Sequence, residues 1–277
     1  MADGLGMELP LPGLDSPLSF AIGERDRETI ALVRRALERR NVMLAYQPIV
    51  QARNPQRVAF YEALIRILDD SGRILPARDF MGAVETTETG RVIDCLALEM
   101  GLDALAETPT LRLAVNMSAR SIGYPRWKRT LARGLAADPT VAERLILEIT
   151  EASAMIMPDI VSVFMDDLQR SGIAFALDDF GAGYTAIRYF KDFDFDILKI
   201  DGQFIQNIHA DPDNQVLTQA LLAIARHFDM FTVAEFVEDP RDAEFLARIG
   251  VDCLQGYLFG APTTMPPWKT AEAARTA

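Results

Sequence analysis

The sequence contains little cysteine and little histidine, with two of each among its 277 residues. Cys95 and Cys253 lie far apart, in the apolar stretches "VIDCLAL" and "GVDCLQGY". Buried free thiols are therefore expected rather than a disulfide framework. Free thiols are typical of a reducing compartment, and we expect the cytoplasm. Neither histidine belongs to an HExxH pattern, so that class of zinc site is excluded.

Positive charge is also scarce, because 28 basic residues stand against 40 acidic ones and the formal net charge is -12. Sequence-independent binding of long nucleic acid needs a basic surface, so we expect no such partner. Apolar runs of membrane-spanning length are missing as well. The N-terminus "MADGLGMELPLPGLDSPLSF" has acids and prolines where a signal peptide has bases and an apolar core. These features predict a soluble protein without a membrane span.

Short β-rich segments recur along the chain and alternate with helical patterns. Hydrophobic residues make up 49% of the sequence and charged residues 25%, which is ordinary for a globular domain with a large core. Eight strand-like repeats over roughly 250 residues predict an α/β fold, a (β/α)₈ barrel of the TIM type. The eight segments are residues 43–50, 57–67, 111–118, 144–150, 174–180, 196–201, 231–237 and 252–259.

The link between the first two segments, "QARNPQ", is too short for a crossover between parallel strands, which needs a dozen residues or more. The first strand is therefore expected to run antiparallel to the second. We expect residues 1–24, rich in Gly and Pro, to form a mobile leader. Residues 25–262 should form one barrel domain that begins with a helix at 25–40, and residues 263–277 a loosely ordered tail.

Polar residues occur late in seven of the eight apolar segments, at the ends of the strands where the active site of such a barrel lies. Any one of these acids is more often a helix cap or a solvated loop charge than a ligand. Seven successive strands with the same feature are not explained by capping. The residues are Glu62, Asn116, Glu148 with Glu151, Asp178 with Asp179, Lys199 with Asp201, Glu235 with Glu238, and Gln255.

The composition of this set indicates its chemistry. It offers oxygen donors with one amide ligand and one lysine, and no histidine, which suits Mg²⁺ or Mn²⁺ rather than Zn²⁺. The adjacent carboxylates of Asp178 and Asp179 repel each other, so a proton or a cation must lie between them. Two cations a few ångströms apart would offset that repulsion and favour phosphoryl chemistry. An enolase-type barrel with Lys199 as the base is the alternative on the residues alone.

The ordered motifs resemble those of the EAL-domain family of cyclic di-GMP phosphodiesterases. The similarity covers about residues 41–262 and includes "YQPIV", "EALIR" at 62–66, "NMS", "EITE", "DDFGAGYT", "KID", "AEFVE" and "QGYLFGAP". The resemblance implies the same barrel with a reversed first strand. It also implies metal-dependent hydrolysis of cyclic di-GMP to linear pGpG. A cyclic di-GMP receptor with little or no catalysis, which signals through a protein partner, is the alternative.

The resemblance also implies roles for individual residues. One cation would be held by Glu62, Asn116, Glu148 and Asp178, and a second by Asp178, Asp179 and Glu235. Lys199 would align the attacking water, and together with Glu62, Asp178 and Glu235 it forms the expected catalytic group. The expected substrate-binding residues are Gln47, Glu62, Leu64, Arg66, Asp201 and Gln255. The residues expected to brace the "DFGAGYT" loop are Glu151 and Glu238.

Two positions depart from the family pattern. Thr185 stands where serine is commonest and keeps the hydroxyl, whereas Phe236 stands where many active members have glycine. Because neighbours along a strand point in opposite directions, we expect Phe236 to face the outer layer of the barrel. The resemblance further implies a homodimer through helices near the "DFG" loop. Residues 186–198, with four aromatics, could serve that interface or belong to the core.

Overall fold

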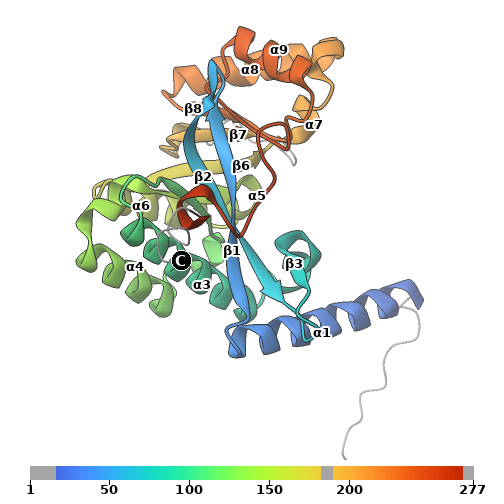
Figure 1. Ribbon diagram of the computed structural model, residues 1–277, viewed down its shortest axis with the longest axis vertical. Coiled ribbons are helices and arrows are strands. Elements are labelled where there is room, and N and C mark those ends of the chain that lie inside the picture. Colours follow the sequence, from blue (N-terminus) through green and yellow to red (C-terminus); the bar gives the residue numbers. More distant parts are fainter. Residues whose placement is uncertain (1–16, 182–189, 271–277) are drawn as a thin grey trace, which may run out of the picture.

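The computed structural model describes residues 17–181 and 190–270, which form strands and helices in alternation (Figure 1). The strands are β1 (Val42–Gln51), β2 (Asn54–Leu68), β3 (Ile74–Pro76), β4 (Leu113–Asn116), β5 (Leu145–Thr150), β6 (Ala174–Phe180), β7 (Ile197–Ile200), β8 (Phe231–Ala234) and β9 (Cys253–Gln255). The α-helices are α1 (Pro17–Glu38), α2 (Met81–Val84), α3 (Glu88–Glu107), α4 (Pro125–Ala137), α5 (Glu151–Ala154), α6 (Pro158–Gln169), α7 (Gly202–Ile205), α8 (Pro212–His227) and α9 (Pro240–Ile249).

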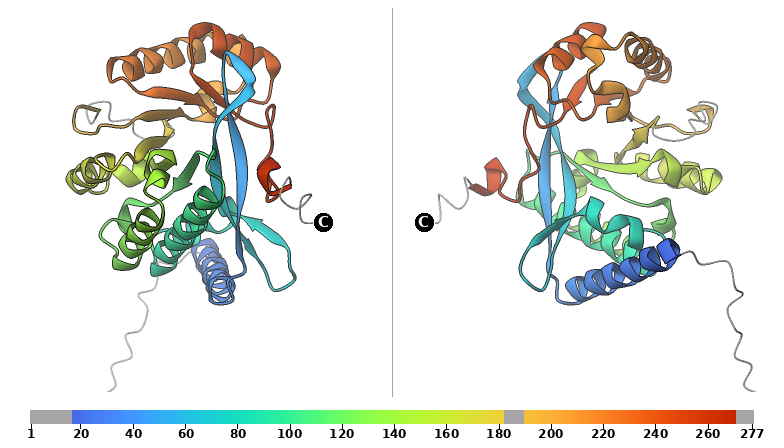
Figure 2. Two further views of the ribbon diagram at one scale, coloured as in Figure 1. Left: turned by 60° about the vertical axis from the view of Figure 1, so that its left-hand side comes forward. Right: turned by 90° about the vertical axis from the view of Figure 1, so that its right-hand side faces the viewer.

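Eight of these strands close into a barrel. The sheet order is β1-β9-β8-β7-β6-β5-β4-β2-β3, and a further pairing of β1 with β2 closes the ring, leaving β3 as an extension of β2 outside it. Neighbours from β4 to β9 pair in parallel, while β1 runs antiparallel to both β2 and β9. The longer helices lie outside the strands (Figure 2). The predicted barrel and its reversed first strand are both confirmed.

The barrel interior is layered, because alternate residues of each strand point inward. One layer is an isolated apolar cluster with one buried residue from each of the eight strands: Ile49, Phe60, Ala114, Ile146, Ala176, Ile197, Val233 and Cys253. This layer fills the barrel as side chains do in other barrels of this kind. The inward positions of the next layer lie two residues further along each parallel strand, and two residues earlier in the reversed strand β1. These are the positions that determine the site.

The N-terminal helix begins earlier than the sequence indicated. Helix α1 starts at Pro17 rather than at residue 25, so the second part of the expected leader is helical, and residues 1–16 lie outside the described part of the chain. Towards its C-terminal end the helix buries Val33 and Ala36 completely or nearly so. Helix α1 contacts α2, α3 and β2. Apolar packing near its C-terminal end thus stabilises this helix. Its first turns were not recognised in the sequence because Gly and Pro residues lie close to them.

The expectation of a loose tail is wrong for residues 263–270. Thr263 and Tyr46 exchange two backbone hydrogen bonds, of 2.8 and 3.1 Å, which add a short bridge beside β1. The Trp268 ring then packs edge-on against Tyr46 and Tyr61, with ring centroids 5.2 and 4.6 Å apart. This part of the chain is anchored to the β1–β2 hairpin by aromatic contacts between residues about 200 positions apart in sequence. Residues 271–277 lie outside the described part.

Other expectations concern buried groups. Cys95 and Cys253 are free and buried, as predicted. Three aromatics of the 186–198 segment, Phe190, Phe193 and Phe195, are buried in the core, whereas residues 186–189 lie outside the described residues. Within residues 17–181 and 190–270, no helix has the length and apolar character needed to cross a bilayer.

Replacement of Trp268 by alanine tests the anchored C-terminal segment. The variant should lower the free energy of unfolding by about 1–3 kcal/mol, because a partly buried indole loses two aromatic contacts. Urea denaturation of Trp268→Ala beside Met265→Ala, which removes a side chain 58% exposed in the same segment, measures this difference. Equal stability of the two variants would show that the segment adds nothing to the fold.

Candidate metal-binding site

A polar ring lies directly above the apolar layer of the barrel. It contains one inward residue from each of the eight strands, and for β8 this is the residue that directly follows the strand. The ring residues are Gln47, Glu62, Asn116, Glu148, Asp178, Lys199, Glu235 and Gln255. Seven of these eight are less than 9% exposed, and Asn116 is partly buried. The strand period of two thus places one strand-end residue from each of the seven segments that the sequence singled out into one ring, together with Gln47 from the reversed strand.

Lys199 occupies the centre of this ring. Its side chain is 1% exposed, and its Nζ lies 2.7 Å from Asp178, 2.9 Å from Glu235, 3.1 Å from Glu148 and 3.5 Å from Glu62. Burial by itself lowers the pKa of Lys199, but the four carboxylates outweigh it and raise that pKa well above its usual value. The lysine is therefore a permanent cation in the middle of the acids.

One lysine does not compensate all of these acids. Burial and the neighbouring carboxylates raise the pKa of Glu148 well above its usual value, and they raise that of Glu235 to about 8. The pKa of Asp179 rises to about 6, first through burial and then through Asp178. Glu62 differs, because Lys199 and two amide donors outweigh its burial and lower its pKa. The site thus has more buried negative charge than its own cation balances.

A bulge in β6 brings the adjacent carboxylates of Asp178 and Asp179 to the same place. In a regular strand the two side chains would point to opposite faces. Here Asp179 adopts a left-handed backbone conformation with φ of 55°, and the pairing with β7 slips by one residue between Leu177 and Phe180. One extra residue of this kind redirects the side chains around it. As a result, oxygens of Asp178, Asp179 and Glu235 lie within 4.8 Å of one another.

The residues of the ring fit hard divalent cations. Several buried oxygens accept no hydrogen bond from any described residue, among them Glu148 Oε1, Glu235 Oε2 and Gln255 Oε1. Buried polar atoms without a partner are costly, and a bound cation is one of the groups that can satisfy them. Because the donors are carboxylates and amides, they suit Mg²⁺ or Mn²⁺. The ring therefore meets the chemical requirements for such an ion.

Amide side chains complete the surroundings of Glu62. Asn116 Nδ2 donates to Glu62 Oε1 at 2.8 Å, and Gln255 Nε2 donates to Glu62 Oε2 at 2.6 Å. Gln255 Nε2 also lies 3.2 Å from Gln47 Oε1, and Gln47 Nε2 donates to the Gly260 carbonyl. Asn116 would use its Oδ1 to hold a cation, so a 180° turn of its amide accompanies that role.

Two acids next to the ring accept hydrogen bonds from backbone amides. Glu151 Oε2 accepts from the Gly181 amide at 3.2 Å, at the start of the loop that it was expected to brace. Gly181 has φ of +98°, and a Cβ at this position would lie 2.2 Å from the Phe204 ring. Asp201 accepts from the Gln203 amide at 2.8 Å and caps α7. Gly183 and Thr185 lie outside the described residues.

The remaining expected residues lie away from the ring. Leu64 and Arg66 follow Glu62 on the same face of β2, both partly buried, with Arg66 Nη1 donating to the Ile65 carbonyl at 2.9 Å. Burial lowers the pKa of Arg66, although its guanidinium remains charged. Glu238 is exposed and makes no hydrogen bond or ion pair with another described residue. Its bracing role therefore has no support from the described part of the chain.

The expected orientation of Phe236 is wrong. Strand β8 ends at Ala234, so strand alternation no longer applies two residues later. Phe236 has φ of 53°, is 53% exposed, and lies so close to Gly202 that a Cβ there would be 2.5 Å from the phenyl ring. Gly202 follows Asp201 at the carboxyl end of β7, so Phe236 lies at the rim of the barrel mouth. A left-handed conformation also explains why glycine suits this position.

One supporting residue escaped the sequence analysis. Asp94 of α3 is buried and accepts from the Ser118 amide at 3.0 Å and from Ser121 Oγ at 2.5 Å, which fixes the loop that follows Asn116. Burial raises the pKa of this carboxyl to about 6. An acid within the apolar run "VIDCLAL" of a helix was the available signal, because unpaired acids are rarely buried.

Comparison with known proteins agrees with this geometry. The EAL domain family model matches residues 31–262. The chain belongs to the EAL domain family. Similar curated proteins include the cyclic di-GMP phosphodiesterase PdeF of Escherichia coli K12, 30% identical over 85% of this chain and 32% of the relative. The bifunctional diguanylate cyclase/cyclic di-GMP phosphodiesterase MucR of Pseudomonas aeruginosa is 34% identical over 83% of this chain and 34% of the relative. The chain thus spans about a third of these relatives.

Solved EAL structures show the same fold. The PaMucR phosphodiesterase in complex with c-di-GMP aligns with a TM-score of 0.74 and 31% identity, covering 88% of this chain and 99% of that one. The FimX EAL domain from Pseudomonas aeruginosa, bound to c-di-GMP, aligns with a TM-score of 0.77 and 26% identity over 86% of this chain and 97% of that one.

Removal of the central lysine tests the charge balance of the ring. Lys199→Met should lower the melting temperature of the metal-free protein at pH 8 by several degrees, because breaking a buried ion pair typically costs about 3–5 kcal/mol. Added Mg²⁺ should recover part of this loss by returning positive charge to the acids. Thermal denaturation with EDTA and with Mg²⁺ measures both effects.

Lys191→Met is the matched control for this experiment, since it removes the same charge from an exposed position. A metal-free Lys199→Met protein as stable as Lys191→Met would contradict the role of Lys199 as the cation that balances the ring.

Proposed function

We propose that the protein is a phosphodiesterase that hydrolyses cyclic di-GMP to linear pGpG. The observation that carries this proposal is the buried ring of carboxylates and amides around Lys199, with the exposed Asp179 beside it. Oxygens of Asp178, Asp179 and Glu235 lie within 4.8 Å of one another. Relatives named as cyclic di-GMP phosphodiesterases, and a similar phosphodiesterase structure in complex with c-di-GMP, support the choice of substrate.

The proposed cofactors are two Mg²⁺ or Mn²⁺ ions. Asp178 would contribute to both, with Glu62, Asn116 and Glu148 on one side and Asp179 and Glu235 on the other. When bound, such ions lower the pKa of the attacking water and offset negative charge on the phosphoryl oxygens. The orphaned oxygens of Glu148 and Glu235 support their assignment as ligands.

In this proposal the residues of the chain position the reactants. Lys199 directs its ammonium group at the attacking water and at charge that develops on the phosphoryl group. The water oxygen forms a bond to phosphorus, the bond from phosphorus to the 3′ oxygen breaks, and that oxygen takes up a proton. Arg66 would bind phosphate through its guanidinium, and Leu64 would pack against the nucleotide. Asp201, Gln47 and Gln255 would orient substrate or water.

The alternative is a cyclic di-GMP receptor that binds without hydrolysis. It predicts binding through the same barrel mouth but no change in the nucleotide. The two are separated by incubating purified protein with cyclic di-GMP and Mg²⁺ or Mn²⁺ and resolving the nucleotides by chromatography, with an EDTA sample as the blank. Formation of pGpG supports the hydrolase, whereas an intact nucleotide that still binds in calorimetry supports the receptor.

A substitution at Glu235 tests the proposed ligand set. Glu235→Gln keeps the size of the side chain but removes its negative charge, so turnover should fall by about 10²-fold or more. Because it is isosteric, folding should be retained. The control is Glu244→Gln, which makes the same change at an exposed position of α9. Wild-type turnover by Glu235→Gln at low metal concentration would rule out this ligand.

We also propose that the protein forms a homodimer in the cytoplasm and responds to a regulatory protein partner. Ile160 and Val163 on α6, with Ile156 just before it, are 47–62% exposed and form an apolar surface that a second copy could cover. The aromatic residues Phe190, Phe193 and Phe195 serve the core instead. Two unpaired thiols are consistent with the reducing conditions of the cytoplasm.

A further inference from the structure

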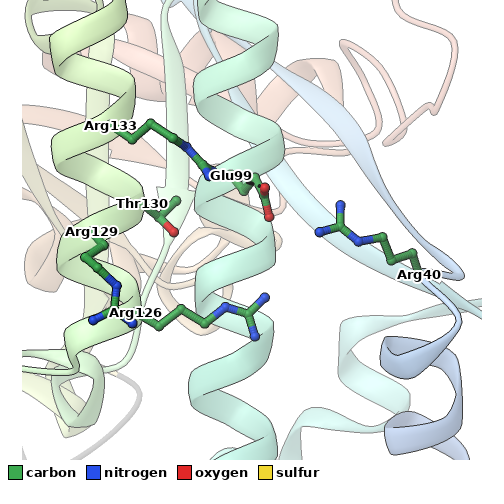
Figure 3. A pocket seen from close by; sticks show the side chains of 6 residues that line it. All are labelled: Arg40, Glu99, Arg126, Arg129, Thr130 and Arg133. Atoms are coloured by element: carbon green, nitrogen blue, oxygen red, sulfur yellow. Dashed lines mark hydrogen bonds and ion pairs between the residues drawn. The ribbon is translucent and has the colours of Figure 1, made fainter.

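A basic groove lies outside the barrel, between α3, α4 and the turn that follows α1 (Figure 3). The groove is open to solvent and has a volume of about 420 Å³, within the size range of small-molecule sites. Its lining residues are Arg40, Glu99, Arg126, Arg129, Thr130 and Arg133, and we call it the arginine groove. Arg40 reaches in from the side opposite to the arginines of α4 (Figure 3). No part of this groove belongs to the polar ring.

The charges of the arginine groove are poorly compensated. Arg133 pairs with Glu99 at 3.1 Å, but Arg40, Arg126 and Arg129 form no ion pair or hydrogen bond through their side chains with another described residue. Three guanidinium groups therefore remain without a partner around one cavity. This occurs in a chain whose net charge is -12, where carboxylates are plentiful. Arg40 and Arg129 are exposed and Arg126 is partly buried, so an anion held between them would offset their mutual repulsion.

Helix α4 carries this charge at an energetic cost. Its sequence "PRWKRTLARGLAA" has four basic residues and no acid, and its first turn lacks the acidic residue that the helix dipole favours. Arg126, Arg129 and Arg133 are spaced by three and four residues, so they are neighbours on one helix face and repel one another. Local preferences for helix stability thus do not explain this sequence, whereas an anion bound in the groove would.

We propose that the arginine groove binds a di- or triphosphate group. Three uncompensated guanidinium groups match an anion with several negative charges, and the planar fork of arginine binds phosphate oxygens in pairs. The cavity is large enough for such a group, and a single groove in an otherwise acidic chain is too small for long nucleic acid. The shared ligand chemistry is a short polyphosphate, either free or carried by a nucleotide.

The test is calorimetric titration of the whole chain with sodium tripolyphosphate in EDTA. The chelator removes divalent ions, so phosphate groups cannot bind through metals in the polar ring, and failure of the proposed hydrolase activity would leave this result unaffected. The wild-type protein should bind tripolyphosphate and gain melting temperature. Arg126→Gln/Arg129→Gln should weaken binding at least tenfold, while Arg170→Gln/Arg248→Gln, with the same loss of charge just after α6 and on α9, should bind like the wild type.

A second readout does not depend on binding heat. Without anion and at low salt, Arg126→Gln/Arg129→Gln should melt at the same temperature as the wild type or higher, because removing like charges from α4 relieves repulsion. ATP and inorganic pyrophosphate, titrated separately, distinguish a nucleotide-borne from a free polyphosphate. The proposal is overturned if the wild type does not bind millimolar tripolyphosphate, or if the double variant binds equally well.

Discussion

Charge compensation inside a closed barrel is the constraint on which the site depends. Strand alternation sends one inward residue from each of eight strands into a single ring, and five of these residues are ionisable. Just beneath the ring lies a layer of buried apolar side chains, so the surroundings screen these charges little. Lys199 lies within 3.5 Å of four carboxylates at once, yet two of these acids, Glu148 and Glu235, still have raised pKa values. The fold is thus built around a deficit of positive charge that divalent ions can fill.

The ring and its rim keep features that cost stability. Asp179 and Phe236 both hold left-handed backbone conformations, which cost roughly 1–2 kcal/mol for a residue with a Cβ. Clustered like charges and orphaned buried oxygens add to that cost. Such departures from local preference concentrate where function requires them, and the surrounding apolar core compensates for them. Helix α4 also departs from local preference, because its basic residues are not balanced by acids on the surface where the arginine groove lies.

The sequence predicted the eight strands, the reversed first strand and the ring residues, because period-two burial and the short "QARNPQ" link are local signals. Other features depend on contacts that no local pattern encodes. The end of β8 before Phe236 changed a side-chain direction that alternation alone misassigned, and the bulge that brings Asp179 beside Asp178 is not encoded by alternation either. Trp268 looked loose because its partners lie about 200 residues away. The grouping of Arg40 with α4 likewise appears only in three dimensions.

Among the residues that the structure describes, the apolar layer beneath the polar ring closes that end of the barrel interior. Its eight side chains are at most 8% exposed and fill the interior below the acids. Within the described part of the chain, the route that remains to the ring is the opposite end, the barrel mouth. In the proposed function, the ions would have to bind before a large ligand covers them, and the product would have to leave before the next ligand enters. Passage through this mouth, past the rim at Phe236, would then set an upper limit on the turnover rate of the proposed enzyme.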